Sequence, residues 1–235
     1  MNIIDYVLLG IVGVSLLYGL YKGFVGSLLG LIALFVAMFA AYAVAPSVAA
    51  SILRNESIVD TLVHYTDAAS RVGDLDMATM AVAGLSDPLI AEVVARVDFP
   101  VPFDALLKGN MAQQVFAAIG SVSVAEYINQ TIVTSMVSVL SYIITFVVAY
   151  VAMSLLTGLF GFVFKFPSLR QLDAILGGVL GLARGVFLVY ILFALVPVVM
   201  TILPFEQFGE LIETSRIGSA LYRSNVITTI LQGHL

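Results

Sequence analysis

The stretch LDAILGGVLGLARG, residues 172–185, combines an apolar helical run with glycines at every fourth position. Gly177, Gly181 and Gly185 fall on one face of a helix, because positions four apart lie almost above one another. A face without side chains lets a neighbouring backbone approach closely, which is typical of helices that pack inside membranes. The stretch therefore predicts a membrane-embedded helix packed tightly against another helix, and Gly19 and Gly23 are further candidates for such packing.

The composition of the whole chain agrees with this prediction. Of its 235 residues, 61% are hydrophobic and only 11% are charged, whereas soluble domains carry about 45–50% apolar and about 25% charged residues. Cysteine is absent, so the sequence offers no disulfide framework, thiolate metal site or thiol nucleophile. The net charge of −5 argues against a nucleic-acid partner, which needs a basic surface to neutralise phosphates.

Four stretches reach the length of about 20 apolar residues that a membrane crossing needs. Their expected ranges are residues 3–20, 24–45, 139–161 and 174–203, with Pro46 ending the second and Pro204 the fourth. The third crossing is expected inside a longer helix that begins near Val124, because Ser123 and Glu126 have the spacing of a capping box. We predict an all-α integral membrane bundle of about four transmembrane helices. Since residues 1–5 carry no base, unlike a signal peptide, we expect both N-terminal helices to be retained.

Two segments lie outside the apolar runs. Residues 53–130 carry ten acidic and four basic side chains, and Asp87 followed by Pro88 predicts a helix that runs to about Val97. We expect helical spacing to resume over residues 103–119, in an extracytoplasmic or interfacial segment that lies on the membrane. Residues 205–235 are expected to form an amphipathic tail. The predicted parts are residues 1–52 (helices one and two), 53–130 (insertion), 131–204 (helices three and four) and 205–235 (tail).

The basic residues predict the orientation of the chain. Lys22 lies in the turn between the first two helices, and Lys165 and Arg170 lie between the last two. Short basic loops face the cytoplasm, so both termini and the acidic segment are expected on the extracytoplasmic side.

Arg184 is the most informative charge inside the predicted bundle. It lies seven residues after Gly177 and therefore points toward the bundle, about 15 Å into the membrane when counted from Ala174. A charge at that depth costs at least about 2.5 kcal/mol. Two interpretations stay open: a functional role as a contact to a substrate or ion or as a switch, or an arginine whose guanidinium reaches back toward the cytoplasmic interface.

Other residues are candidates for function or for packing. Asp5 and Lys22 flank the first helix, and Asp173 lies at the cytoplasmic edge of the fourth. An acid at a helix N-terminus, such as Asp5, usually matches the helix dipole; proton or partner binding is the alternative. A stripe of hydroxyl side chains on the third helix could line a path for a solute or bond between helices. It consists of Thr131, Thr134, Ser138, Ser141 and Thr145. An alanine stripe on the second helix predicts close packing: Ala33, Ala37, Ala41 and Ala45.

Signals for catalysis are weak. The sequence has no HExxH motif, no glycine-rich phosphate loop and no acidic pair within the crossings. Ser86 precedes a predicted helix, where serine usually serves as a cap. We therefore expect no enzymatic activity, no cofactor and no metal.

Several short motifs, taken in order, resemble the colicin V production (CvpA) family of bacterial inner-membrane proteins. They are Ile4-Asp5-Tyr6, Gly19 with Lys22-Gly23-Phe24, Phe166-Pro167 leading to Leu172-Asp173, Leu176-Gly177-Gly178, Leu180-Gly181 and Arg184-Gly185, and finally the region from Ser215 to Tyr222. The resemblance covers about residues 1–46 and 132–222. It implies a membrane protein needed for toxin production or export and for envelope homeostasis.

Two functions therefore stay open for the chain. The first is a non-enzymatic inner-membrane scaffold or partner-binding subunit, whose partners are membrane lipid, other membrane or periplasmic proteins, or a second copy in a homo-oligomer. The second is a small transporter or channel that uses Arg184 and the hydroxyl stripe.

Overall fold

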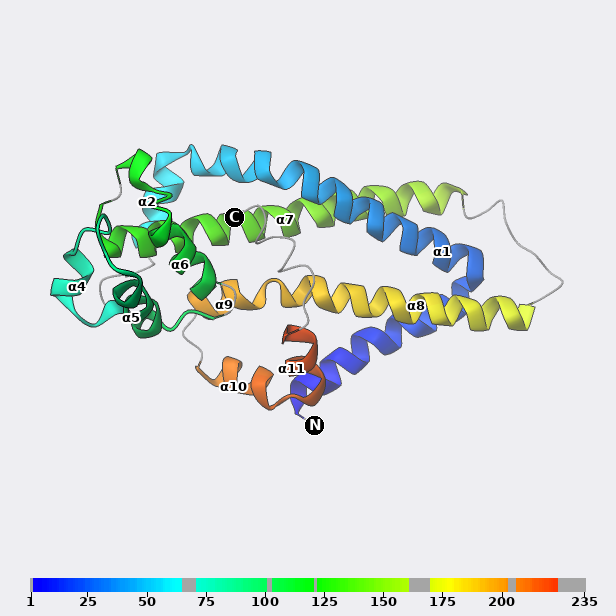
Figure 1. Ribbon diagram of the computed structural model, residues 1–235. Helices are drawn as coiled ribbons and strands as arrows, with labels where there is room; N and C mark the ends of the chain where they lie inside the picture. Colours follow the sequence, from blue (N-terminus) through cyan, green and yellow to red (C-terminus); the bar gives the residue numbers. More distant parts are fainter. Residues whose placement is uncertain are drawn as a thin grey trace. The chain divides into compact units, whose positions relative to one another are not determined.

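Figure 1 shows the computed structural model, which describes residues 2–64, 71–100, 103–120, 122–160, 170–202 and 206–223. The helices are α1 (Ile3–Leu53), α2 (Glu56–His64), α4 (Leu75–Thr79), α5 (Asp87–Val97), α6 (Phe103–Ala112), α7 (Val124–Phe160), α8 (Arg170–Phe193), α9 (Val196–Ile202), α10 (Glu206–Thr214) and α11 (Arg216–Arg223), with a 3₁₀ turn at Ala117–Ile119. Within these residues there is no strand, only an isolated bridge between Ala81 and Ser123. The prediction of an all-α membrane bundle is confirmed.

Three of the helices described, α1, α7 and α8, are long and apolar enough to cross a membrane. Helix α1 has 51 residues, or about 77 Å at the usual helical rise, which is more than twice the apolar thickness of a bilayer. It bends at Gly23, where φ is 73° and ψ is −177°. Each arm, residues 3–22 and 24–53, is long enough for one crossing. The number of four crossings stays a prediction.

Two predicted helix ends are wrong. The second helix does not stop at Pro46 but continues to Leu53, because a proline removes only one helical hydrogen bond and membrane helices tolerate that loss. The fourth does not run to residue 203: α8 ends at Phe193, and α9 starts after a turn. Pro197 follows Phe193 by four residues, so its ring crowds the Phe193 carbonyl and its nitrogen cannot donate the helical hydrogen bond.

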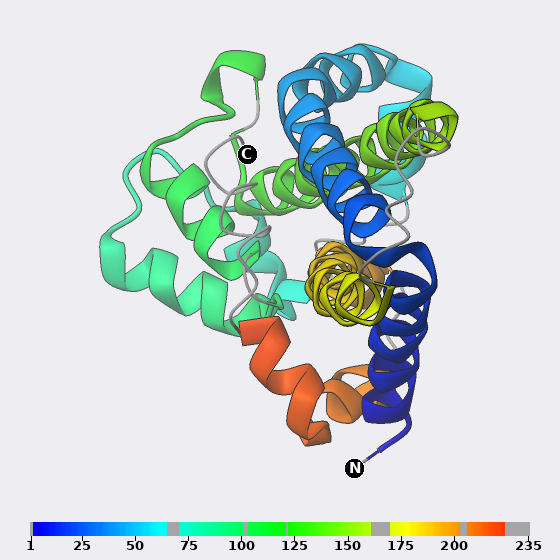
Figure 2. The ribbon, with the colours of Figure 1, turned by 90° about the vertical axis from the view of Figure 1, so that its right-hand side faces the viewer.

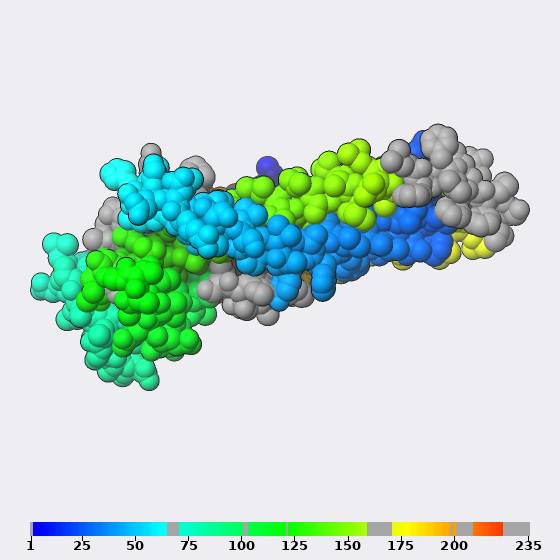
Figure 3. Space-filling view, turned by 90° about the horizontal axis from the view of Figure 1, so that it is seen from above, coloured from blue at the N-terminus to red at the C-terminus, as the bar shows by residue number. Residues whose placement is uncertain are grey.

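The chain divides into two compact units, the first of which contains Met1–Pro46, Ser141–Ala194 and Glu206–Ile227. In this unit α8 runs antiparallel to the first arm of α1, and the two helices lie side by side in Figures 1 and 2. Residues on the second arm of α1 and the end of α7 lie next to each other in Figure 3. The predicted alanine stripe on this arm is buried: Ala33, Ala37, Ala41 and Ala45 expose at most 5% of their surface.

The second unit contains Ser47–Leu140, Leu195–Phe205 and Thr228–Leu235. Helices α5 and α6 contribute a buried apolar core here: Ile90, Val93, Val97, Phe103, Leu107 and Met111. The segment therefore has a packed interior, a feature that its modest apolar stripes did not predict. Its position at the membrane surface stays a prediction.

Local signals in the second unit predicted the regions where α5, α6 and α7 begin. Ser123 N–H donates to Glu126 Oε2 at 2.9 Å and Glu126 N–H donates to Ser123 Oγ at 3.3 Å, which confirms the capping box and the start of α7. Helix α5 ends at Val97 as predicted. Ser86, expected as a cap, occupies its N-cap position, but the Ser86 side chain makes no capping hydrogen bond. The expected helix over residues 103–119 is interrupted after Ala112, where Gln114 adopts a positive φ of 50°.

Candidate functional site

The glycines of α8 bring its backbone into direct contact with the first arm of α1. A methyl group placed on Gly177 would lie 2.5 Å from the carbonyl oxygen of Gly19, and one on Gly181 would lie 3.0 Å from the Gly19 Cα. Ser15 Oγ also donates a hydrogen bond of 2.7 Å to the Gly181 carbonyl. Gly185 faces the same helix near Ser15. The structure thus brings together the predicted packing glycines of both helices.

Gly23 turns the chain between the two arms of α1. Its φ of 73° lies in the left-handed region, which glycine adopts without the strain that a side chain would bring. The turn starts a new helical arm at Phe24, whose N–H donates to Asp173 Oδ1 at 2.9 Å. Asp173 therefore caps the second arm from α8, and its negative charge matches the positive end of that arm's dipole.

The guanidinium of Arg184 lies between aromatic rings rather than beside a carboxylate. Its Cζ is 5.0 Å from the ring centre of Tyr18 and 6.0 Å from that of Tyr150. Lys22, one turn after Tyr18, places its Nζ 5.6 Å from the same Tyr18 ring. The Arg184 side chain thus reaches toward the bend that carries Lys22. Its buried Nε has no hydrogen-bond partner.

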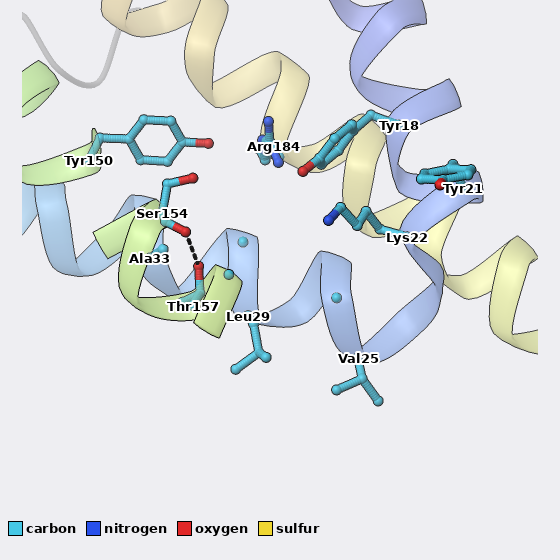
Figure 4. A pocket seen from close by; sticks show the side chains of 13 residues that line it. Tyr18, Tyr21, Lys22, Val25, Leu29, Ala33, Tyr150, Ser154, Thr157 and Arg184 are labelled. Carbon is cyan, nitrogen blue, oxygen red and sulfur yellow. Dashed lines mark hydrogen bonds between the residues drawn. The ribbon is translucent and has the colours of Figure 1, made fainter. Parts of the chain in front are cut away.

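A cavity of about 550 Å³ opens beside these cations (Figure 4). Its polar lining comprises Tyr18, Tyr21, Lys22, Tyr150, Ser154, Thr157 and Arg184. Figure 4 shows the Tyr150 and Ser154 side chains directed from α7 toward Arg184, while Lys22 extends toward it from the bend of α1. The volume falls in the range of about 300–1,000 Å³ that ligand pockets occupy.

Two glycines of the second arm make room for the cations. A methyl group on Gly26 would lie 3.1 Å from Lys22 Cβ, and one on Gly30 would lie 3.3 Å from Arg184 Nη1. Sequence reasoning missed both glycines, although their spacing of four residues repeats the spacing on α8. Tyr18 and Tyr150 were not predicted as neighbours of Arg184 either.

The predicted hydroxyl stripe does not line this cavity. Ser141 is fully buried and its Oγ has no hydrogen-bond partner, whereas Thr134, Ser138 and Thr145 are partly buried. The hydroxyl groups at the cavity belong to Ser154 and Thr157, further along α7.

Asp5 lies in a separate place, at the start of α1. Its side chain is buried and accepts hydrogen bonds from Ser215 Oγ at 2.7 Å, from Ile217 N–H at 3.0 Å and from Asn2 N–H at 2.9 Å. Because Ser215 and Ile217 form the N-terminal end of α11, the carboxylate fastens this helix of the tail to α1.

Ser86, the residue weighed above for catalysis, occupies the N-cap position of α5 without a side-chain capping hydrogen bond. Residues 2–64, 71–100, 103–120, 122–160, 170–202 and 206–223 contain no group of three or more metal-ligating side chains. Lys165 and Phe166-Pro167, which support the predicted orientation and family, lie outside the described residues.

A family model described as colicin V production protein matches residues 4–93 and 111–224. The chain belongs to the colicin V production protein family. The match includes Asp5, Lys22, the bend at Gly23, the glycine face of α8 and Arg184. Its gap, residues 94–110, covers the end of α5, the connection after it and most of α6. Comparisons with curated proteins and with solved structures gave no match. Family membership and the three long apolar helices identify a multi-pass membrane protein.

Proposed function

We propose that this colicin V production family member is a non-enzymatic scaffold or partner-binding subunit of the bacterial inner membrane. In this role it supports toxin production or export and envelope homeostasis, as the family membership suggests. The observation that carries the proposal is the apolar exterior of the first unit. Large side chains are highly exposed on its helices: Phe39 by 75%, Val148 by 65% and Leu155 by 68%.

Such side chains need lipid or protein around them, since soluble surfaces rarely expose apolar patches of this extent. The tightly packed α1–α8 pair gives them a rigid base, because its helices touch through backbone atoms. We propose that part of this exterior binds another membrane protein or a second copy of the chain.

Site-specific photo-crosslinking in cells tests the proposal. A photoreactive side chain at Phe39, Val148 or Leu155 should give discrete protein adducts, while one at exposed Glu92 in the second unit serves as the comparison. If every apolar position yields only lipid adducts, the role as a protein scaffold is wrong.

The predicted orientation places both termini and residues 53–130 outside the cytoplasm. The natural absence of cysteine allows single cysteines to report this directly. Lys22→Cys should react with a membrane-impermeant maleimide only after permeabilisation, and Glu92→Cys should react in intact spheroplasts. The reverse pattern would overturn the orientation.

A small transporter or channel is the second candidate, because Arg184 lines a cavity of about 550 Å³. Arg184→Leu and Ser154→Ala should then change solute flux in proteoliposomes without changing the circular dichroism spectrum. Ser138→Ala is the matched control, since Ser138 does not line the cavity. Absence of flux under both voltage and pH gradients would eliminate this candidate.

A further inference from the structure

The cavity at the bend of α1 has an unusual balance of charge. Two cationic side chains, Lys22 and Arg184, line it, and the described lining residues include no acid. Asp173 lies close by, but its Oδ1 accepts the Phe24 N–H and Asp173 does not line the cavity. Lys22 is exposed at the bend, whereas Arg184 is partly buried in the bundle. A positive charge at the depth of Arg184 is costly, so an anion beside it would be stabilised.

The start of the second arm of α1 also borders the cavity, through Val25 and Gly26. Because Asp173 already caps this helix end at the Phe24 N–H, the positive charge in the cavity comes from the side chains of Lys22 and Arg184 rather than from the helix dipole. Arg184, which lines the cavity, also has a buried Nε without a hydrogen-bond partner.

A second, more apolar space lies beside the cavity. It measures about 530 Å³ and is lined by Tyr18 and Arg184, which also line the cavity, and by apolar residues of α1 and α8. The apolar lining includes Val7, Ile11, Val14 and Leu188. A polar, cationic cavity and an apolar groove therefore share Tyr18 and Arg184 as a common wall.

From this juxtaposition we propose that the first unit binds one phosphate-bearing anionic lipid. The phosphate lies between Lys22 and Arg184, with the hydroxyls of Tyr150 and Ser154 as further donors, and an acyl chain follows the groove along the first arm of α1. Phosphate suits the site because it accepts several charge-assisted hydrogen bonds at once. The groove favours a lipid over free phosphate, since a soluble anion would leave it unfilled.

Binding to the purified full-length protein tests the proposal, with native mass spectrometry used to count bound molecules. Dioctanoyl phosphatidic acid supplies both head and tail, glycerol phosphate supplies the head alone, and dioctanoylglycerol supplies the tail alone. We expect one phosphatidic acid per chain, bound at least about tenfold more tightly than either fragment, because only the whole lipid satisfies both spaces.

Charge and shape variants locate the site. Lys22→Gln and Arg184→Gln should each weaken phosphatidic acid binding by about tenfold or more, as loss of a charge-assisted hydrogen bond requires. Lys108→Gln is the matched control, since Lys108 is exposed on α6 in the second unit. Lys22 is itself exposed, so its variant keeps the test valid if Arg184→Gln does not fold.

Gly158 lines the polar cavity and Gly10 the apolar groove, and a Cβ at either position meets nothing within 4 Å, so Gly158→Leu and Gly10→Leu should fill these spaces without changing any charge. A Cβ at Gly13 also meets nothing within 4 Å, and Gly13 lines neither space, so Gly13→Leu should bind phosphatidic acid normally. If glycerol phosphate binds as tightly as phosphatidic acid, the ligand is a soluble phosphate and the lipid proposal is wrong. If Lys108→Gln weakens phosphatidic acid binding as much as Lys22→Gln does, or if neither Lys22→Gln nor Gly158→Leu weakens it, the lipid does not bind in this cavity.

Discussion

Gly177→Ala should separate α8 from the first arm of α1. The new methyl group would lie 2.5 Å from the Gly19 carbonyl oxygen and 2.5 Å from the Gly23 carbonyl carbon, whereas ordinary contact begins at 3.4 Å. Both obstacles are backbone atoms, so no side chain can rotate away. The helices must move apart by roughly 1 Å, because packed interiors contain no space to absorb the methyl group.

That movement has a calculable cost. Overpacking costs about 1–3 kcal/mol, and the Ser15–Gly181 hydrogen bond, now 2.7 Å long, would stretch beyond bonding distance at a further cost of about 1 kcal/mol. We expect a loss of about 2–4 kcal/mol, or a roughly 30- to 1,000-fold change in the unfolding equilibrium. Reversible unfolding in mixed micelles, followed by circular dichroism, measures it.

Gly13→Ala is the matched control, because its methyl group meets nothing within 4 Å. This variant should be neutral or stabilise the protein by up to about 1 kcal/mol, since alanine favours the helix over glycine. If the two variants differ by less than about 0.5 kcal/mol, where independent surface changes usually fall, the contact between α1 and α8 is not as close as described.

Three further substitutions test the polar contacts. Asp5→Ala removes the acceptor that holds α11, so trypsin should cleave after Arg216 several-fold faster while residues before the tail stay resistant. Asp173→Ala leaves the Phe24 N–H without its cap and should lower stability by about 0.5–2 kcal/mol, with Asp173→Asn closer to the parent. Ser123→Ala should cost about 1 kcal/mol through the lost capping box, measured by the same micellar unfolding.

Features encoded over a few neighbouring residues could be predicted from the sequence. The capping box at Ser123 and the smooth face at Gly177 and Gly181 depend on helical spacing alone, and the structure forms both. The break after Phe193 was also encoded locally, through Pro197, but the apolar composition of the stretch concealed it. Hydrophobicity reports the solvent around a helix and does not report whether its backbone is continuous.

Contacts between distant parts of the chain could not be predicted. Asp173 and Phe24 are 149 residues apart, and Asp5 and Ser215 are 210 apart. For Asp5 and Asp173 the sequence shows only a charge at a helix end, which fits an interfacial position equally well. The surroundings of Arg184 could not be predicted either, because tyrosine rings from two other helices lie beside it and no local sequence pattern links them to it.

Because of the bend at Gly23, the number of residues between it and the packing positions on either side cannot change without disrupting the fold. It joins two helical arms through a single residue, so there is no loop to absorb a change in length. Each inserted residue rotates the preceding arm by about 100°. One extra residue between Gly19 and Gly23 would therefore carry Ser15 and Gly19 away from α8 and place bulky neighbours against its glycines. Insertions and deletions should be tolerated in the turn between α5 and α6, which the family model leaves unmatched, and rejected within the first bend.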